Sequence, residues 1–172
     1  MGLSVLFKAF MTSIFLTLVS GVAQGNEPLI IYPLGDSITR GIDNIGYRQF
    51  LFDDLKAEGV HVQFVGSLSH GPEGFSQSHH EGHNGWTIGQ LDRSVDQWLS
   101  TYDPDVILLM AGANDIQRVF WDWKGMPSRM GRLIDTITTQ RPNAIVLVSE
   151  LTVLPLAFLD KQAVVFNEQL QT

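Results

Sequence analysis

Residues 29–37 read LIIYPLGDS, a short apolar run that ends in a Gly-Asp-Ser turn. An apolar run of this length, bounded by turn residues, is typical of a strand that is buried on both faces of a sheet. We therefore predict a strand over residues 29–34 that opens into a turn at residues 35–37. A serine at a strand-to-helix turn can present its hydroxyl to a substrate while its own N–H points at a developing oxyanion. It can also be an ordinary helix-capping serine, so Ser37 alone leaves both interpretations open.

Strand and helix signals alternate through the rest of the chain. Apolar runs predict further strands at residues 61–65, 105–110 and 144–148. Residues 66–85 are rich in Gly, Ser and His and are predicted to form a loop between the second strand and the next helix.

Apolar residues at helical spacing predict four helices that follow these strands. Gly59 ends the first helix, and Thr87 with Gln90 can form a capping box at the start of the second. The fourth helix begins near Asp160 and is still running at Thr172. The apolar faces of the first three are Tyr47, Phe50, Leu51 and Leu55; Ile88, Leu91, Val95, Trp98 and Leu99; and Met126, Met130, Leu133, Ile134 and Ile137.

This order of elements predicts an α/β fold, a parallel sheet with helices on both faces. Ligands of such sheets bind outside the carboxyl ends of the strands, where two further motifs are expected. Residues 82–87 (GHNGWT) lead into the second long helix, and residues 112–115 (GAND) end the third strand. A glycine such as Gly85 lets its backbone N–H approach a ligand, and the Asn114 amide is a neutral donor for an oxyanion. Both motifs are also ordinary turn sequences.

In this order, the three motifs together resemble the SGNH (GDSL-type) hydrolase superfamily. Residues 35–37 match its first motif, Gly85 its glycine motif, and residues 112–115 its Gly-x-Asn-Asp motif. The resemblance implies a flavodoxin-like three-layer α/β/α domain that uses no cofactor. It also implies that Ser37 is the nucleophile, with an oxyanion hole formed by the N–H groups of Ser37 and Gly85 and the side chain of Asn114.

Within the superfamily, three stretches look most like carbohydrate esterase family three, the acetyl xylan esterases. They are residues 46–48 (GYR), 64–67 (FVGS) and 80–88 (HEGHNGWTI), and the resemblance runs from Leu29 to the C-terminus. It implies a serine esterase that hydrolyses O-acyl esters on carbohydrate such as xylan through an acyl-enzyme, with acetyl as the expected acyl group. A lipase or thioesterase with the same machinery is an alternative. The lack of a long apolar segment that could form a lid in the mature chain counts against it. A non-catalytic carbohydrate-binding remnant is the other alternative.

The fourth signature of the superfamily, Asp-x-x-His, is not found in the sequence. Its histidine is the general base, so neither that base nor its aspartate is present. His83 is not expected to replace it, because related esterases carry a histidine in that stretch as well as the later base. We therefore interpret residues 26–172 as a C-terminally incomplete hydrolase domain that lacks its last strand. The histidines that are present all precede the third strand: His61, His70, His79, His80 and His83.

Residues 1–25 are predicted to be a secretory signal peptide. Lys8 is followed by an apolar run over residues 9–19 and then by small residues through Gly25. Thr and Ser interrupt this run, and it is shorter than the roughly 20 apolar residues of a spanning helix. We expect cleavage near residue 25, export to the periplasm or the medium, and no stable membrane anchor.

Composition excludes several classes of protein. The 172 residues are 44% hydrophobic and 17% charged, which is typical of one globular domain and excludes a disordered chain. The net charge of −7, without Lys/Arg runs, makes nucleic acid a poor partner. The chain has no cysteine, which excludes disulfides, thiolate metal sites and a catalytic thiol.

Two clusters of ligand-type residues need an interpretation. Residues 79–83 (HHEGH) lack the His-Glu-x-x-His spacing, so no metal site is expected there. The aromatic rings of Trp86, Trp121 and Trp123 could stack on sugar rings, whereas Trp98 falls on a predicted core face.

Overall fold

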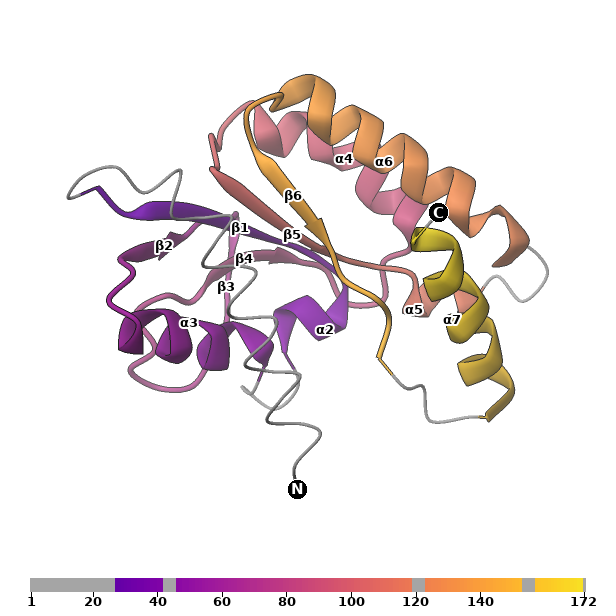
Figure 1. The fold of residues 1–172 in the computed structure, drawn as a ribbon, viewed down its shortest axis with the longest axis horizontal. Helices are drawn as coiled ribbons and strands as arrows, with labels where there is room; N and C mark the ends of the chain where they lie inside the picture. The colour runs from indigo at the N-terminus through magenta and orange to yellow at the C-terminus, as the bar shows by residue number, and fades with distance from the viewer. Residues whose placement is uncertain (1–26, 42–45, 119–122, 153–156, 172) are drawn as a thin grey trace.

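The computed structural model describes residues 27–41, 46–118, 123–152 and 157–171, so the predicted signal peptide lies outside the described residues. The apolar run that follows it becomes the middle of a six-stranded sheet, flanked by helices (Figure 1). The strands are β1 (Leu29–Gly35), β2 (Val62–Phe64), β3 (Leu68–Ser69), β4 (His79–Gly82), β5 (Val106–Met110) and β6 (Ile145–Val148). The predicted α/β architecture is confirmed.

The strand order brings three carboxyl ends together. The sheet runs β3-β4-β1-β5-β6, and β2 pairs with the first half of β1. β1, β4, β5 and β6 are parallel, and Gly35 at the end of β1 is level with Gly82 of β4 and Met110 of β5. Chain segments that leave β1, β4 and β5 therefore start side by side at one edge of the sheet.

The prediction of one loop over residues 66–85 is wrong, because this segment contains β3 and β4. β4 pairs with β1 in parallel, and β3 pairs with β4 antiparallel, so the sheet is mixed rather than wholly parallel. β4 has the sequence HHEG, and its buried residues include His80 and Glu81. The buried side chains of His80 and Glu81 are polar, so hydrophobic periodicity could not reveal this strand.

Helices cover both faces of the sheet. One core cluster joins Tyr32 and Leu34 of β1 to the buried faces of α4 and α6, which lie side by side in Figure 1. The other joins Leu29 and Ile31 of β1 to Leu55 of α3. The helices are α2 (Ser37–Arg40), α3 (Tyr47–Ala57), α4 (Ile88–Leu99), α5 (Ala113–Arg118), α6 (Met126–Gln140) and α7 (Ala157–Leu170), with a 3-10 turn η1 (Trp123–Gly125) before α6.

Two helix predictions need correction. α7 begins at Ala157 and ends at Leu170, so its predicted start near Asp160 is late, and the predicted continuation fails at Gln171, while Thr172 lies outside the described residues. In α3, Leu55 is buried as predicted, but Phe50 is 54% exposed and Arg48 is only 2% exposed. The guanidinium of Arg48 occupies the inward face of the first turn, which is why an apolar pattern misplaced that face. Within the described residues, no helix is long and apolar enough to cross a bilayer.

Candidate active site

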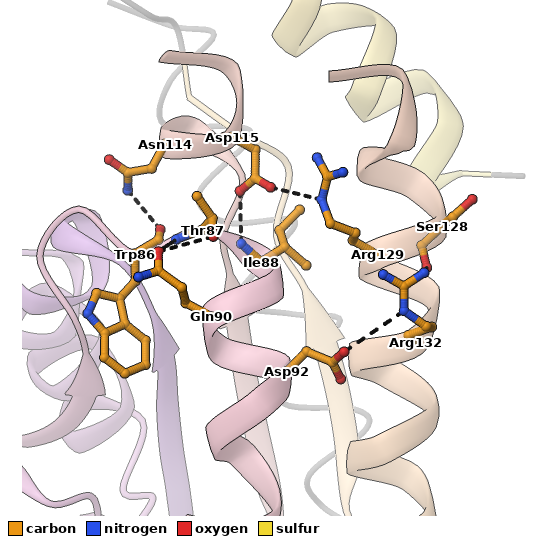
Figure 2. A network of polar contacts seen from close by, with 10 residues as sticks. All are labelled: Trp86, Thr87, Ile88, Gln90, Asp92, Asn114, Asp115, Ser128, Arg129 and Arg132. Atoms are coloured by element: carbon orange, nitrogen blue, oxygen red, sulfur yellow. Dashed lines mark hydrogen bonds and ion pairs between the residues drawn. The ribbon is translucent and has the colours of Figure 1, made fainter. Parts of the chain in front are cut away.

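The three sequence motifs meet at the shared edge of the sheet. Ser37 is the first residue of α2, directly after β1, and it is half-buried. Gly85 lies between β4 and α4, and Asn114 lies in the first turn of α5 after β5. The Asn114 side-chain amide donates to the carboxylate of Asp36 (3.3 Å) and to the carbonyl of Trp86 (2.9 Å; Figure 2). One amide thus links the residue before Ser37 to the residue after Gly85.

Gly85 itself has the backbone conformation that the motif needs. Its φ of +74° lies in the left-handed region, which glycine adopts without strain. The N–H of Trp86 donates to the carbonyl of His83 (3.2 Å), which closes a turn over residues 83–86. Any side chain at position 85 would strain this turn, so the glycine is required by the backbone.

Asp36 is a buried carboxylate at the base of the site. Its Oδ1 accepts from the N–H of Ile38 (2.9 Å) and so caps α2, which begins with Ser37. Burial raises the pKa of Asp36 to about 6, with a further contribution from the charge of Asp115. The hydrogen bonds from Ile38 and Asn114 act in the opposite direction but do not cancel the cost of burial.

This pKa makes the stability of the fold depend on pH. Between about pH 4 and pH 6 the folded protein holds a proton on Asp36 that the unfolded chain, with its ordinary value of 3.8, has lost. The free energy of unfolding should therefore fall as pH rises through this window, by on the order of 2–3 kcal/mol. Urea unfolding at several pH values should show a steeper fall in the wild type than in Asp36→Asn, which keeps only the contribution of Asp115, whose pKa is also raised. Equal slopes in both proteins would contradict it.

Asp115, the last residue of the GAND motif, ties the same loops to the helices behind them. Its fully buried carboxylate accepts from the N–H of Ile88 (2.8 Å), the first residue of α4, and from Nε of Arg129 in α6 (3.1 Å; Figure 2). Burial raises the pKa of Asp115, against the hydrogen bond from Ile88 and the charge of Arg129. The start of α4, three residues after Gly85, is thereby fixed to α5. The sequence motif contained Asp115, but sequence reasoning assigned it no task.

Removing this carboxylate should destabilise the protein strongly. Asp115→Ala leaves a buried N–H without an acceptor and takes the buried partner from Arg129, so we expect a loss of about 3 kcal/mol. Asp92→Ala is the matched control, because Asp92 contacts the 60% exposed side chain of Arg132 at 4.0 Å (Figure 2) and accepts from the Thr136 hydroxyl (3.1 Å). The control should lose less than about 1 kcal/mol. Urea unfolding of both variants measures the difference, and equal losses would show that Asp115 is no special anchor.

Arg48 holds α2 against the segment that follows β3. Its buried guanidinium donates to the carbonyls of Thr39 (2.9 Å), Arg40 (2.9 Å), His70 (2.6 Å) and Ser78 (3.1 Å). Burial lowers the pKa of Arg48, and within the described residues no carboxylate forms an ion pair with it. Carbonyl dipoles therefore compensate the buried cation. Sequence reasoning used Arg48 only as part of the GYR resemblance and did not find this contact.

The structure separates the aromatic candidates. Trp86 is half-buried next to Gly85, and its ring stacks on His83 (4.2 Å between centroids) and lies 5.8 Å from the ring of Trp98. Trp98, predicted as core, packs partly against the core and completes this stack. Trp123 lies in η1 and also packs against the core. Trp121 lies outside the described residues.

The histidines have separate partners. The ring of the buried His80 accepts from the N–H of Gly82 (2.9 Å), and burial together with the charge of Arg48 lowers its pKa to about 3. His83 contacts the carboxylate of Glu81 (2.7 Å). In the described part of the chain, no histidine forms a hydrogen bond with the Ser37 hydroxyl, and no three His, Asp or Glu side chains are grouped to hold a metal.

Comparisons with known proteins identify the family of this chain. The sequence matches the GDSL-like Lipase/Acylhydrolase family over residues 34–172. It is 32% identical to a multidomain esterase of Ruminococcus flavefaciens over 136 residues, which is 66% of this chain but 17% of that protein. Among solved structures, a family 3 carbohydrate esterase of Clostridium thermocellum superposes with a TM-score of 0.76 and 32% identity, covering 84% of this chain and 72% of that one.

A second family 3 carbohydrate esterase, from Talaromyces cellulolyticus, shares the fold with a TM-score of 0.71 and 24% identity over 83% of this chain and 70% of its own. The chain spans less than a fifth of the length of the multidomain esterase. The matched residues include all three motifs that meet at the sheet edge. This chain belongs to the GDSL-like lipase/acylhydrolase family.

Proposed function

We propose that this chain is a serine esterase that hydrolyses O-acyl esters on carbohydrate such as xylan, with acetyl as the expected acyl group. The observation that carries the proposal is the Asn114 amide, which bonds both Asp36 and the Trp86 carbonyl. Through these two contacts, the hydroxyl-bearing turn at Ser37 and the glycine turn at Gly85 lie on either side of one neutral donor. Such a donor supports the proposal, because an oxyanion that replaces one of its two present acceptors would be stabilised next to the Ser37 hydroxyl.

The reaction proceeds through an acyl-enzyme. Ser37 Oγ attacks the ester carbonyl carbon, and the negative charge that develops on the carbonyl oxygen is held by the N–H groups of Ser37 and Gly85 and by the Asn114 amide. The bond to the sugar oxygen then breaks, and that oxygen leaves with a proton. Water attacks the acyl-enzyme in the second half of the reaction, which releases the carboxylic acid and restores the Ser37 hydroxyl.

This scheme needs a group that takes the Ser37 proton and delivers it to the sugar oxygen. The family supplies it from Asp-x-x-His, which this sequence does not contain. A serine hydroxyl without a base is a poor nucleophile at neutral pH. We therefore propose slow hydrolysis for residues 26–172 as they stand.

Two observations support a carbohydrate ester over a lipid or thioester. The related structure with 32% identity is a family 3 carbohydrate esterase. The half-buried ring of Trp86 lies next to the proposed oxyanion donor Gly85. Aromatic faces suit the apolar faces of sugar rings. A lipase or thioesterase of the same family remains the alternative enzyme, and a carbohydrate-binding remnant the alternative without catalysis.

The test measures hydrolysis of several esters by the wild-type protein and by two serine-to-alanine variants. Wild-type protein should release acetate from acetylated xylan and 4-nitrophenolate from its acetate ester, and Ser37→Ala should remove both activities. Ser128→Ala, at an exposed serine of α6, is the matched control and should retain them. Preference for a long-chain acyl ester would favour the lipase alternative. Binding to xylan without any Ser37-dependent hydrolysis would favour the remnant.

We also propose that residues 1–25 direct export and are then removed. The support is the sequence pattern alone, a single lysine followed by a short apolar run and small residues. Expressed in a bacterium with its own N-terminus, the protein should be recovered from the periplasm or medium with a new start near Asn26. N-terminal sequencing decides this. Full-length protein retained in the membrane fraction would contradict it.

A further inference from the structure

Glu81, in the middle of β4, is a fully buried carboxylate with four donors around it. One oxygen accepts from the Tyr32 hydroxyl (3.2 Å) and from the N–H of Ser67 (2.8 Å). The other accepts from the Ser67 hydroxyl (2.6 Å) and from Nε2 of His83 (2.7 Å). Burial alone would raise the pKa of Glu81, but the hydrogen bonds from His83 and Ser67 outweigh it and hold the pKa below its usual range. Glu81 is therefore an ionised acceptor, and Nε2 of His83 is the protonated nitrogen that donates this hydrogen bond to it.

The His83 residue is held at three further points. Its backbone N–H donates to the carbonyl of Gly35 (2.9 Å), two residues before Ser37. Its imidazole stacks on Trp86 at 25° and on Trp98 at 7°, with centroids 4.2 and 4.7 Å apart. Its carbonyl accepts from the N–H of Trp86 (3.2 Å). Side chain and backbone are thus both fixed.

This residue begins the turn that carries Gly85. The hydrogen bond from the N–H of Trp86 to the carbonyl of His83 closes a four-residue turn. Gly85 is its third residue, with a φ of +74°. The direction of the Gly85 N–H follows from where the turn begins and ends. The far end, the carbonyl of Trp86, receives the Asn114 amide (2.9 Å).

We propose that His83, anchored by its hydrogen bond to Glu81, is a positioning residue that aims the Gly85 N–H at the oxyanion. Through the same turn it fixes the Trp86 carbonyl, which orients the Asn114 amide. His83 has no hydrogen bond with Ser37 in the described part of the chain, so it acts through the turn and not on the nucleophile. The proposal rests on the proposed function, because it assumes that Ser37 attacks an ester whose carbonyl oxygen enters this oxyanion hole.

Two substitutions separate the contacts of the His83 side chain. His83→Phe keeps an aromatic ring for Trp86 and Trp98 but cannot donate to Glu81. His83→Gln loses the ring but keeps an N–H at about the position of Nε2. His79→Ala is the matched control, because His79 lies on β4, the strand that ends just before His83, and its side chain is exposed.

The measurement is the rate at which an alkyl phosphonofluoridate labels Ser37, followed by intact-protein mass. The Ser37 oxygen bonds to phosphorus, fluoride leaves, the proton goes to solvent, and the phosphoryl oxygen takes the oxyanion position. Labelling needs no deacylation, so slow reaction over hours is still measurable. The dependence on reagent concentration separates the maximal labelling rate from reagent binding.

The maximal labelling rate of His83→Phe should fall by up to about 10²-fold with reagent binding nearly unchanged, as expected when a donor is misplaced. His83→Gln should keep most of the wild-type rate, and His79→Ala all of it. If His83→Phe fails to fold, Glu81→Gln removes the charge of the anchor and should show the same loss of rate.

The outcomes are distinguishable. A purely structural role would slow His83→Phe and His83→Gln in proportion to their loss of thermal stability, and this would overturn the inference. Undiminished labelling of a folded His83→Phe would overturn it as well, while the proposed function would stand. Wild-type protein in which Ser37 is not labelled at all would overturn the proposed function, and this inference with it.

Discussion

Joining a C-terminal segment that contains Asp-x-x-His, taken from a family 3 carbohydrate esterase, to Thr172 should raise ester hydrolysis by several orders of magnitude. The sequence of this chain holds no such tetrapeptide, and in the described structure no histidine contacts Ser37. In serine hydrolases, loss of the histidine base costs about 10⁶ in kcat and leaves roughly 10³–10⁴ over water from the oxyanion hole and binding. Kinetics of the chain and of the chimera on 4-nitrophenyl acetate measure the gain.

The added histidine is its own control. Its substitution by alanine should return the chimera to the rate of the original chain. The chimera should also be more soluble, because β6 is the last strand in the order of the described sheet and the added strand would cover its edge, and the alanine variant should keep that solubility. Rates typical of enzymes, about 1–10³ s⁻¹, from the 172-residue chain alone would show that it has a base of its own.

Asn114→Ala should lower kcat by about 10²–10³ with little change in KM. The amide should bond the oxyanion of the transition state more strongly than the neutral carbonyl of the ester, so its loss acts on the chemical step. The measurement is steady-state hydrolysis of 4-nitrophenyl acetate, best made in the chimera, where the rate is higher. Asn143→Ala, at an exposed asparagine, is the control and should have no effect.

A different result would give Asn114 a different role. The residue also joins Asp36 to the Trp86 carbonyl, so it could serve only to hold two loops together. In that case Asn114→Ala would lower the thermal stability and leave kcat unchanged. Such an outcome would remove Asn114 from the oxyanion hole and weaken the proposed function.

Apolar runs predicted the main strands well, because β1 and β5 lie in the middle of the sheet between two cores. The motifs at their carboxyl ends could therefore be expected at one edge of the sheet, and the Asn114 contacts bring them together there. β4 was missed because its buried face is polar. The contact of Glu81 with Tyr32 could not be predicted, because the two residues lie 49 positions apart and nothing local in the sequence indicates it.

The prediction of the inward face of α3 was wrong for a related reason. Helical periodicity assigns inward positions to apolar residues, and a buried arginine that bonds only carbonyls violates that assumption. Its acceptors belong to the backbone, so they have no sequence pattern of their own. Contacts of this kind become visible only when the chain is folded.

The same contacts leave the segment between β3 and β4 open to variation. Arg48 holds this segment by the carbonyls of His70 and Ser78, and every amino acid supplies a carbonyl. Glu73 and Ser76 are exposed, so substitutions there should not disturb the anchor. A library of variants at these two positions, with Arg48 kept, would sample new surface chemistry on an unchanged scaffold. The anchor thus separates what the loop displays from how the loop is held.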